Sequence, residues 1–338
     1  MGKKEASNDR GCVMKAVVLH GEVPEGAGRD EQDVLVQAGH VSRSLAEQGY
    51  KPTVLAVSAN FSRLIDQLNI LQPDFAFNLV ESILGQGRLI HMTPSILDCL
   101  NIPYTGARTE AIFVTSQKLL AKRYLQMRGL DTPPWISPDE SHANPFTPGS
   151  YVIKSVWEHA SVGLDEDSIV SVQNEKKLHK IMKSKRDRLG GACFAEAFIA
   201  GREFNLSLLA GPDGPEVLPP AEIRFDDYPP GKHRVVGYRA KWDEDSFEYQ
   251  NTPRAFEFPA EDALLLEKLK KMSLECWQIF DLKGYARVDF RVDQEGRPWI
   301  LEINTNPCLS PDAGFHAAAE RAGLKTNGII ERIVNDTC

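Results

Sequence analysis

Residues 284–307 read GYARVDFRVDQEGRPWILEINTNP, and this stretch decides the fold. Two runs of alternating apolar and polar residues flank the pair Glu295-Gly296, a pattern that predicts a β-hairpin. With these two residues as the loop, position 293 lies opposite 298, 291 opposite 300, 289 opposite 302 and 287 opposite 304. The sequence therefore predicts two antiparallel strands in which Asp289 faces Glu302.

Alternation along such strands separates the side chains onto two faces. One face carries four polar side chains: Arg287, Asp289, Glu302 and Asn304. The other carries four apolar side chains that we expect in the core: Val288, Phe290, Leu301 and Ile303. Two carboxylates and an amide oxygen suit Mg²⁺ that also holds substrate phosphates, but a solvated face with an Asp–Arg ion pair fits the same spacing. The apolar opposite face and the Asn-Thr-Asn-Pro ending favour the metal site.

The composition is that of an ordinary globular protein. The chain has 338 residues, 42% hydrophobic and 25% charged, which excludes a disordered, collagen-like or low-complexity chain. Because one domain rarely exceeds about 250–300 residues, we expect two or three compact units. The 47 acidic residues outnumber the 39 basic ones, for a net charge of −8. This balance argues against nucleic acid as the main partner but allows a local basic pocket.

No targeting or membrane segment is recognisable in the sequence. No stretch approaches the ~20 apolar residues of a membrane helix. The charged start MGKKEASNDRGCV has no apolar segment behind it, so residues 1–13 are predicted to form a polar tail. The six cysteines are scattered without a CxxC pair, which is typical of reduced thiols. We expect a cytoplasmic protein without a membrane partner.

Strands and helices alternate in the first third of the chain. Apolar, β-branched runs predict strands at 15–21, 51–58 and 74–80, and helical spacing predicts helices at 34–49 and 62–72. This order is typical of an α/β layer with a parallel sheet, in which ligands bind at the carboxyl ends of the strands. Those ends are residues 20–22 and 78–81.

The rest of the chain mixes the two element types. We predict a helix at 115–130, strands at 151–156 and 168–172, a basic helix that ends at Gly190-Gly191, and two strands on either side of Ala200-Gly201. Residues 224–250 are rich in proline, glycine and charge, and we predict that they form a mobile lid.

Seven short motifs occur in one order between residues 15 and 330. They are NIPYTG (101–106), SQKLLAK (116–122), VIKSVWEHASVG (152–163), FAEAFIAGREF (194–204), LPPAEIRF (218–225), YRAKW (238–242) and EINTNP (302–307). Together they resemble the ATP-grasp superfamily, and within it the D-alanine–D-alanine ligase family. The resemblance implies an α/β fold, with a Rossmann-like N-terminal domain followed by two α+β ATP-grasp lobes that enclose the nucleotide.

The resemblance also implies a division of the chain. The polar tail at 1–13 would precede an N-terminal substrate domain at 14–116 and a central ATP-grasp lobe at 117–203. A C-terminal lobe at 204–338 would carry the metal site and the lid at 224–250.

The residues that would bind metal and nucleotide follow from the same resemblance. Two Mg²⁺ ions, or Mn²⁺, would be held by Asp289, Glu302 and Asn304, with Glu302 bridging them. The phosphates of ATP would contact Lys118, Lys154 and Lys241 as point charges. The loop covering the phosphates would be Glu158, His159, Ala160 and Ser161. The nucleoside would contact Glu196 through its adenine amino group, Glu203 through its ribose hydroxyls, and Ala197, Phe198 and Ile199 along the adenine slot.

Several of these residues also have a plainer interpretation. Lys118 and Lys122 lie four residues apart and fit a solvated helix face. Glu196 fits the solvent face of an edge strand, and Phe198 fits a core position. Lys154 interrupts an apolar strand, so its ammonium group must reach solvent or find an anion.

The chemistry that the resemblance implies is ATP-dependent formation of an amide bond. ATP phosphorylates a carboxylate to an acylphosphate, and an amine then attacks to give a tetrahedral oxyanion. Arg287 matches the family's oxyanion-stabilising arginine. It also fits a cross-strand ion-pair partner of Asp289, and one side chain can fill both roles.

The group that would bind the ammonium of the first substrate is left open among four carboxylates. Glu31 is the first candidate, with Asp30 and Asp33 beside it, and all three suit helix N-terminal charges equally. Asn78 stands where the family has a His-Gly segment, and Glu81 close behind it is the fourth candidate.

Other amino-acid-binding positions depart from the family's pattern. Ala160 and Trp242 stand at a serine and a tyrosine that order the lid, and Ala313 stands at a serine that helps hold the carboxylate of the second substrate. Cys308 stands at a glycine whose N–H helps hold the oxyanion.

These departures predict an ATP-dependent carboxylate–amine ligase for small amino acids or their derivatives, with substrates other than two D-alanines. A D-alanine–D-alanine ligase of peptidoglycan synthesis with a diverged lid and a non-catalytic ATP-binding module stay open as alternatives, and so does a homodimer.

Overall fold

The computed structural model describes residues 13–138, 144–157, 164 and 168–337. Its helices are α1 (Arg29–Glu47), α2 (Phe61–Leu71), α3 (Met92–Cys99), α4 (Thr109–Ser116), α5 (Lys118–Met127), α6 (Glu175–Lys185), α7 (Tyr238–Trp242), α8 (Phe247–Gln250), α9 (Ala263–Ile279), α10 (Gly314–Arg321) and α11 (Thr326–Asn335). Its strands are β1 (Lys15–Gly21), β2 (Lys51–Val57), β3 (Phe75–Asn78), β4 (Trp135–Ile136), β5 (Gly149–Ser155), β6 (Ile169–Val172), β7 (Cys193–Ala197), β8 (Arg202–Leu209), β9 (Glu216–Val217), β10 (Ala221–Ile223), β11 (Arg254–Ala255), β12 (Tyr285–Val292) and β13 (Pro298–Asn304). Within this part of the chain, no helix combines the length and apolarity needed to cross a membrane.

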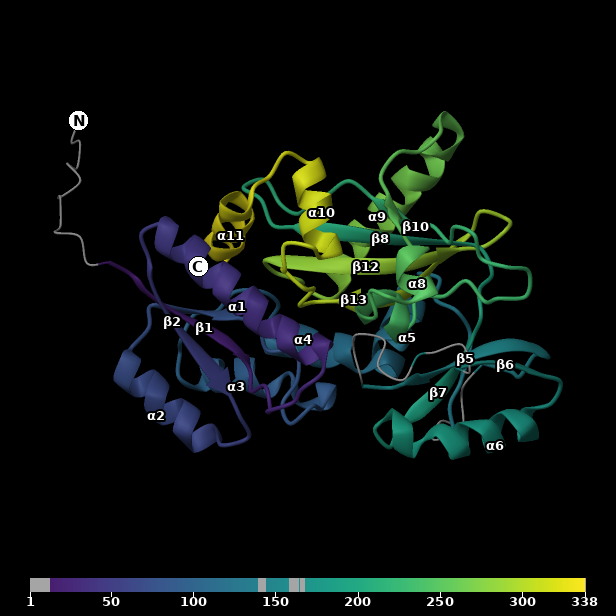
Figure 1. Cartoon of the computed structure of the whole chain (residues 1–338), viewed down its shortest axis with the longest axis horizontal. Helices are drawn as coiled ribbons and strands as arrows, with labels where there is room; N and C mark the ends of the chain where they lie inside the picture. Colours follow the sequence, from purple (N-terminus) through teal and green to yellow (C-terminus); the bar gives the residue numbers. More distant parts are fainter. Residues whose placement is uncertain (1–12, 139–143, 158–163, 165–167, 338) are drawn as a thin grey trace.

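The first third of the chain forms the parallel sheet that the sequence predicts. Its strand order is β2-β1-β3, and both pairs are parallel. Figure 1 shows β2 beside β1. The three predicted strands are confirmed with small shifts at their ends. α1 begins five residues before the predicted helix because Gly28 serves as its N-cap and donates its N–H to the Glu31 carboxylate.

The predicted single helix at 115–130 is wrong, because the chain breaks at Gln117 into α4 and α5. Gln117 leaves the helical region at ψ 92°, and its side-chain oxygen accepts from the N–H of Leu120 at the start of α5. The N–H of Lys118 donates to the carbonyl of Val156 just beyond β5, at 3.0 Å. The break therefore ties the start of α5 to the end of β5.

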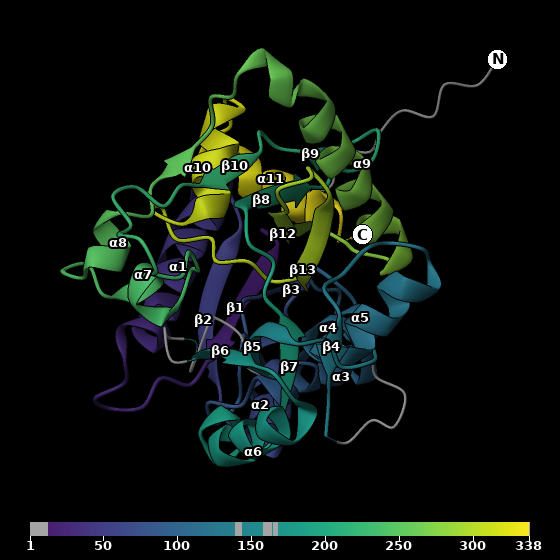
Figure 2. The same ribbon diagram turned by 90° about the vertical axis from the view of Figure 1, so that its right-hand side faces the viewer.

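The middle of the chain forms a four-stranded antiparallel sheet in the order β4-β7-β5-β6, with α6 packed against it. Because β7 has a partner on each side, Glu196 does not lie on an edge strand, and that interpretation is wrong. The sheet and α6 lie at the opposite end of the molecule from α9 and α10 (Figure 2).

The hairpin at 284–307 is confirmed, but only half of its predicted register is correct. Arg287 pairs with Asn304 and Asp289 with Glu302 as predicted. Beyond Asp289 the register shifts by one, so that Phe290 pairs with Ile300, and the loop is longer than two residues. The bulge occurs at Leu301, which lines the main cavity instead of joining the core as predicted.

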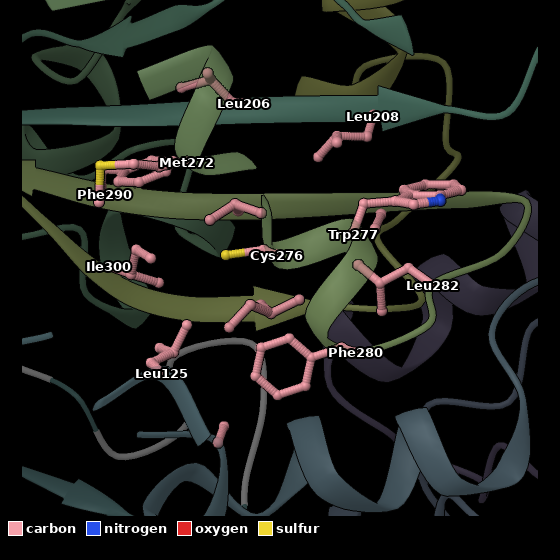
Figure 3. Close-up of a cluster of buried hydrophobic side chains, with 14 of the residues drawn as sticks. Leu125, Leu206, Leu208, Met272, Cys276, Trp277, Phe280, Leu282, Phe290 and Ile300 are labelled. Carbon is pink, nitrogen blue, oxygen red and sulfur yellow. The ribbon is translucent and has the colours of Figure 1, made fainter. Parts of the chain in front are cut away.

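The hairpin belongs to a six-stranded sheet whose main path is β11-β10-β8-β12-β13. One face of this sheet is covered by α9. Figure 3 shows side chains from this helix packed against β8, β12 and β13: Met272, Cys276, Trp277, Leu206, Leu208, Phe290 and Ile300. With that face filled, the polar side chains of the hairpin are held on the other face.

The two ends of the chain share one core. Apolar side chains of β1, β3 and α1 pack with Tyr285 of β12 and with α10 and α11. Figure 1 shows α1 and α11 side by side, and Ser44 of α1 donates to Asn327 of α11 at 2.7 Å. The first sheet is thereby fixed against the hairpin sheet.

The connection between β7 and β8 requires a glycine at position 201. This glycine has φ +150°, and a Cβ at this position would lie 2.0 Å from the carbonyl oxygen of Val292. We expect Gly201→Ala to lower the free energy of unfolding by about 2 kcal/mol or more, because both the backbone and β12 must shift. Gly39 on the exposed surface of α1 has open space around it. Gly39→Ala is the control and should raise that free energy by about 0.5–1 kcal/mol in the same denaturant titration.

Candidate active site

The main cavity has a volume of about 840 Å³ and lies where the three sheets meet. Its wall includes Gly21 at the end of β1, Lys118 at the start of α5, Lys154 of β5 and Glu302 of β13. Another part of the wall comes from five residues of the predicted lid: Val235, Val236, Ala240, Lys241 and Trp242. A volume in the range of about 300–1,000 Å³ is typical of small-molecule sites.

The polar face of the hairpin forms the floor of this cavity. The guanidinium of Arg287 donates to both carboxylate oxygens of Asp289, at 2.7 and 2.8 Å. Asn205 on the neighbouring strand β8 donates to the same carboxylate at 2.8 Å. The predicted Asp–Arg ion pair is therefore present, and it lies in a cavity rather than on a solvated face.

Glu302 lies among cations from three parts of the chain, one of which is its own hairpin. Burial alone would raise the pKa of its carboxyl, but Lys118, Lys241 and Arg287 outweigh this effect and lower the pKa to about 2. Burial lowers the pKa of Lys241, and Glu302 opposes that change. The helix start, the lid and the hairpin thus converge on one carboxylate.

Glu196 makes a buried ion-pair cluster with two lysines. Lys122 donates to it at 2.6 Å and to Thr132 at 2.7 Å, and Lys154 donates to its other oxygen. Burial alone would raise the pKa of Glu196, but the two lysines lower it. Burial lowers the pKa of Lys122 to about 8. The interpretation of Lys122 as part of a solvated face is wrong, because its side chain is only 3% exposed.

Glu203 and Phe198 line the cavity next to Arg291. The Nη2 of Arg291 lies 3.1 Å from the Glu203 carboxylate, and its guanidinium lies 5.6 Å from the centre of the Phe198 ring. Burial raises the pKa of Glu203, and Arg291 opposes this. Phe198 is partly exposed on the cavity wall rather than in the core, and Ala197 and Ile199 flank it there.

The predicted metal ligands offer oxygen atoms only. Asp289 and Glu302 are cross-strand neighbours, and Asn304 follows two residues later, all on the cavity wall. Across the described residues, no three His, Cys, Asp or Glu side chains are grouped so that they could hold a metal ion. The set named here has two carboxylates, and its third member is an amide. Two carboxylates and an amide oxygen fit a hard divalent cation.

A second group of carboxylates lies where α1 meets the turn after β13. Asp33 accepts from Ser310 Oγ at 2.7 Å and from the Cys308 thiol at 3.0 Å. Burial, together with Glu81 and Asp33, raises the pKa of Cys308 well above its usual range. Glu31, Asp33, Glu81 and Cys308 all line the cavity. The carboxylate of Asp33 therefore already accepts hydrogen bonds from Ser310 and Cys308. Glu31 is exposed.

Of the remaining predicted site residues, some line the cavity and others do not. Trp242 and Ala313 line the cavity, and the indole N–H of Trp242 is buried without a hydrogen-bond partner. Asn78 is 3% exposed, accepts from the N–H of Val80 and is absent from the cavity wall. The candidates Glu158, His159, Ala160 and Ser161 lie outside the described residues.

The wall also carries polar residues that are not among the sequence candidates, and they include Gln37, Asn205, Arg254 and Arg291. Alternation offered a signal for Arg291, which follows Arg287 and Asp289 on the same face, and for Asn205, which follows Glu203. Gln37 donates to Glu81 at 3.2 Å and accepts from the N–H of Leu309, and no local pattern indicates that contact.

The buried lysine cluster makes a prediction about stability. Lys122→Met leaves Glu196 with one cation instead of two, and we expect the free energy of unfolding to fall by about 3–5 kcal/mol. Lys180→Met on the exposed side of α6 is the control and should change it by less than about 0.5 kcal/mol. Equal effects of the two substitutions would contradict a buried ion pair.

Glu302 makes a prediction about pH. Its pKa falls from an ordinary 4.5 to about 2 in the folded protein, so its ionised form stabilises the fold above pH 4.5. This contribution disappears as the pH falls from 4.5 towards 2. We therefore expect the free energy of unfolding of wild type to exceed that of Glu302→Gln at neutral pH. This gap between the two proteins should close as the pH falls from 4.5 towards 2. Urea titrations at several pH values measure the gap, and a constant gap would contradict the assignment.

Comparison with known proteins places this geometry in a family. A family model described as D-ala D-ala ligase C-terminus matches residues 148–335. A D-alanine–D-alanine ligase of Aquifex aeolicus is 29% identical over 326 residues, which cover 95% of this chain and all of the relative. One from Thermotoga maritima is 27% identical, with 95% of this chain and 96% of the relative covered.

Solved structures agree in fold. The D-alanine–D-alanine ligase of Bacillus anthracis in complex with ATP superposes with a TM-score of 0.72 at 22% identity, covering 96% of this chain and 97% of that one. D-alanyl-alanine synthetase A of Vibrio cholerae has a TM-score of 0.72 at 17% identity, with 96% and 98% covered. These likenesses show the α/β fold that the sequence motifs imply, and the family model shows that the chain belongs to the D-alanine–D-alanine ligase family.

Proposed function

We propose that the protein is an ATP-dependent carboxylate–amine ligase that joins small amino acids or their derivatives. The observation that carries this proposal is the convergence of three lysines on a carboxylate pair in one cavity: Lys118, Lys154 and Lys241 around Glu302 and Asp289. Lysines bind phosphates as point charges, and carboxylates at the same place bind the accompanying divalent cation.

The nucleotide would occupy the part of the cavity lined by β5, β7 and β8. Phe198 offers a ring face to the adenine, and Glu203 offers carboxylate oxygens to the ribose hydroxyls. Glu196 is already bound to Lys122 and Lys154, so an adenine amino group would join a carboxylate with two cationic partners. ATP as the nucleotide is also supported by the Bacillus anthracis relative, which was solved in complex with it.

Asp289, Glu302 and Asn304 would hold Mg²⁺. When bound, the metal would neutralise charge on the phosphates. Arg287 already occupies both oxygens of Asp289. This ion pair compensates the negative charge of Asp289 and fixes the guanidinium of Arg287 on the cavity wall.

The reaction has two steps. A carboxylate oxygen of the first substrate attacks the γ-phosphorus of ATP, the bond to the bridging oxygen breaks, and ADP leaves with the lysines compensating its charge. The amine nitrogen of the second substrate then attacks the acyl carbon, and the oxyanion that forms collapses with release of phosphate and loss of a proton from nitrogen. Arg287 donates to the oxyanion, and the backbone N–H of Cys308 is the second candidate donor. Such a reaction uses ATP, which supports a cytoplasmic location.

The family relatives support a second candidate with the same chemistry. Relatives that align along nearly the whole chain are named D-alanine–D-alanine ligase, which supports D-alanine as both substrates. Trp242, Cys308 and Ala313 on the cavity wall differ from the residues that we associate with that substrate pair, and they favour other amino acids. Buried polar sites discriminate steeply when partners change.

Phosphate release distinguishes these candidates. We expect release, and an amide product by mass, with one pair in a panel of D- and L-amino acids given with ATP and Mg²⁺. Release with D-alanine alone would identify a D-alanine–D-alanine ligase. ATP binding without turnover on every pair would overturn the ligase proposal and leave a nucleotide-binding module.

Glu302→Gln tests the metal assignment in the same assay. We expect at least about a 10²-fold loss of phosphate release, because one of the two metal carboxylates becomes neutral. The matched control is Glu295→Gln, an exposed carboxylate in the turn of the same hairpin. Undiminished activity of Glu302→Gln would refute the assignment.

A further inference from the structure

Arg254 is a cation on the cavity wall that neither the metal set nor the nucleotide set uses. It lies in β11, where it pairs with Ile223 of β10. Its guanidinium crosses to the turn before α10 and donates to the carbonyl of Asp312 at 3.1 Å. Among the described residues, no carboxylate lies within ion-pair distance of it.

The fold makes room for this side chain. A Cβ on Gly314 would lie 3.2 Å from Nε of Arg254 and 3.8 Å from its Cδ and Cζ. Any residue other than glycine at the start of α10 would therefore press on the guanidinium. The position of Arg254 is set from two sides, by the Asp312 carbonyl and by the bare backbone of Gly314.

A second cation shares this end of the cavity. Arg287 is one of the groups that lower the pKa of Arg254, after burial. Arg287 has Asp289 as its partner, whereas Arg254 has only a carbonyl. Because no carboxylate of the described residues forms an ion pair with Arg254, its guanidinium keeps a positive charge on the cavity wall that an anionic ligand would compensate.

The anion is identified by elimination. The lysines around Glu302 are the proposed partners of the phosphates. The carboxylate of the first substrate becomes the acyl group beside Arg287. The remaining anion in the reaction of two amino acids is the carboxylate of the second one, which supplies the amine. Arg254 donates to the carbonyl of Asp312, and the next residue, Ala313, lines the same cavity and offers no hydroxyl.

We propose that Arg254 binds the carboxylate of the amine substrate and so makes the enzyme select amino acids over amines without a carboxylate. This inference rests on the proposed ligase function and adds to it the residue that selects the second substrate. An arginine forms charge-assisted, paired hydrogen bonds to a carboxylate. Loss of Arg254 should therefore weaken binding of the amino acid far more than binding of an uncharged analogue.

The test compares two acceptors of the acyl group. Hydroxylamine carries no carboxylate and traps an acylphosphate as a hydroxamate, releasing phosphate. The amino acid that acts as acceptor in the panel, and its carboxamide, are then compared with hydroxylamine in wild type and in Arg254→Ala. We expect the ratio of amide product to hydroxamate to fall about 10- to 100-fold in Arg254→Ala, as a raised KM for the amino acid. The preference for amino acid over carboxamide should fall by a similar factor.

Two further variants separate a binding role from a structural one. Gly314→Ala keeps the charge and displaces the guanidinium, so it should lower the same ratio by a smaller factor. Arg224→Ala removes a nearby arginine that pairs with Asp226 and is absent from the cavity wall, and it should leave the ratio unchanged. Thermal unfolding of each variant records whether the fold is kept.

The outcomes are distinct. A wild-type protein that forms no hydroxamate with any acid would overturn the ligase function, and this inference with it. Hydroxamate formation together with an unchanged acid-to-carboxamide preference in Arg254→Ala would overturn the role of Arg254 alone. Equal use of amino acids and simple amines by wild type would do the same.

Discussion

The pairing of β12 with β8 on one side and β13 on the other is the constraint on which the site depends. It places Asp289 beside Asn205 and opposite Glu302, and it places Arg291 beside Glu203. Because α9 fills the other face with apolar side chains, the sheet cannot rotate these charges away from the cavity. The bulge at Leu301 changes the register only beyond Asp289, so the paired carboxylates keep their positions.

Charge compensation is the second organising feature. Carboxylates in a closed cavity are costly unless cations accompany them. Each main carboxylate of the nucleotide end has such partners: Glu196 has Lys122 and Lys154, and Glu203 has Arg291. The net charge of −8 therefore hides a local excess of cations around Glu302 that suits a polyphosphate. Lys122 comes from α5 and Lys154 from β5, so the ion pairs of Glu196 also join these two elements to β7.

The end of the cavity that we propose for the amino-acid substrates is built differently, from contacts between distant parts of the chain. Asp33 and Gln37 of α1 hold the turn after β13 through Ser310 and the N–H of Leu309. Asn306 in that turn donates to the carbonyl of Val80, which follows β3. This end of the cavity therefore depends on side chains and backbone groups from both sheets. Arg254 adds a charge from a third element, and the glycine at the start of α10 makes space for it.

The sequence alone determined the order of strands and helices in the first third of the chain, the parallel first sheet and the facing of Asp289 and Glu302, because alternation and turn signals act over a few residues. It also placed Lys118, Lys154 and Lys241 on motifs whose order implied the family. Only the tertiary structure decided the break at Gln117, the shift at Leu301 and the burial of Lys122, since each depends on an element far away in the chain. It also decided that Asn78 turns away from the cavity and that Arg254 turns into it. Local patterns specify which face a side chain takes, whereas the packing of distant elements specifies what that face meets.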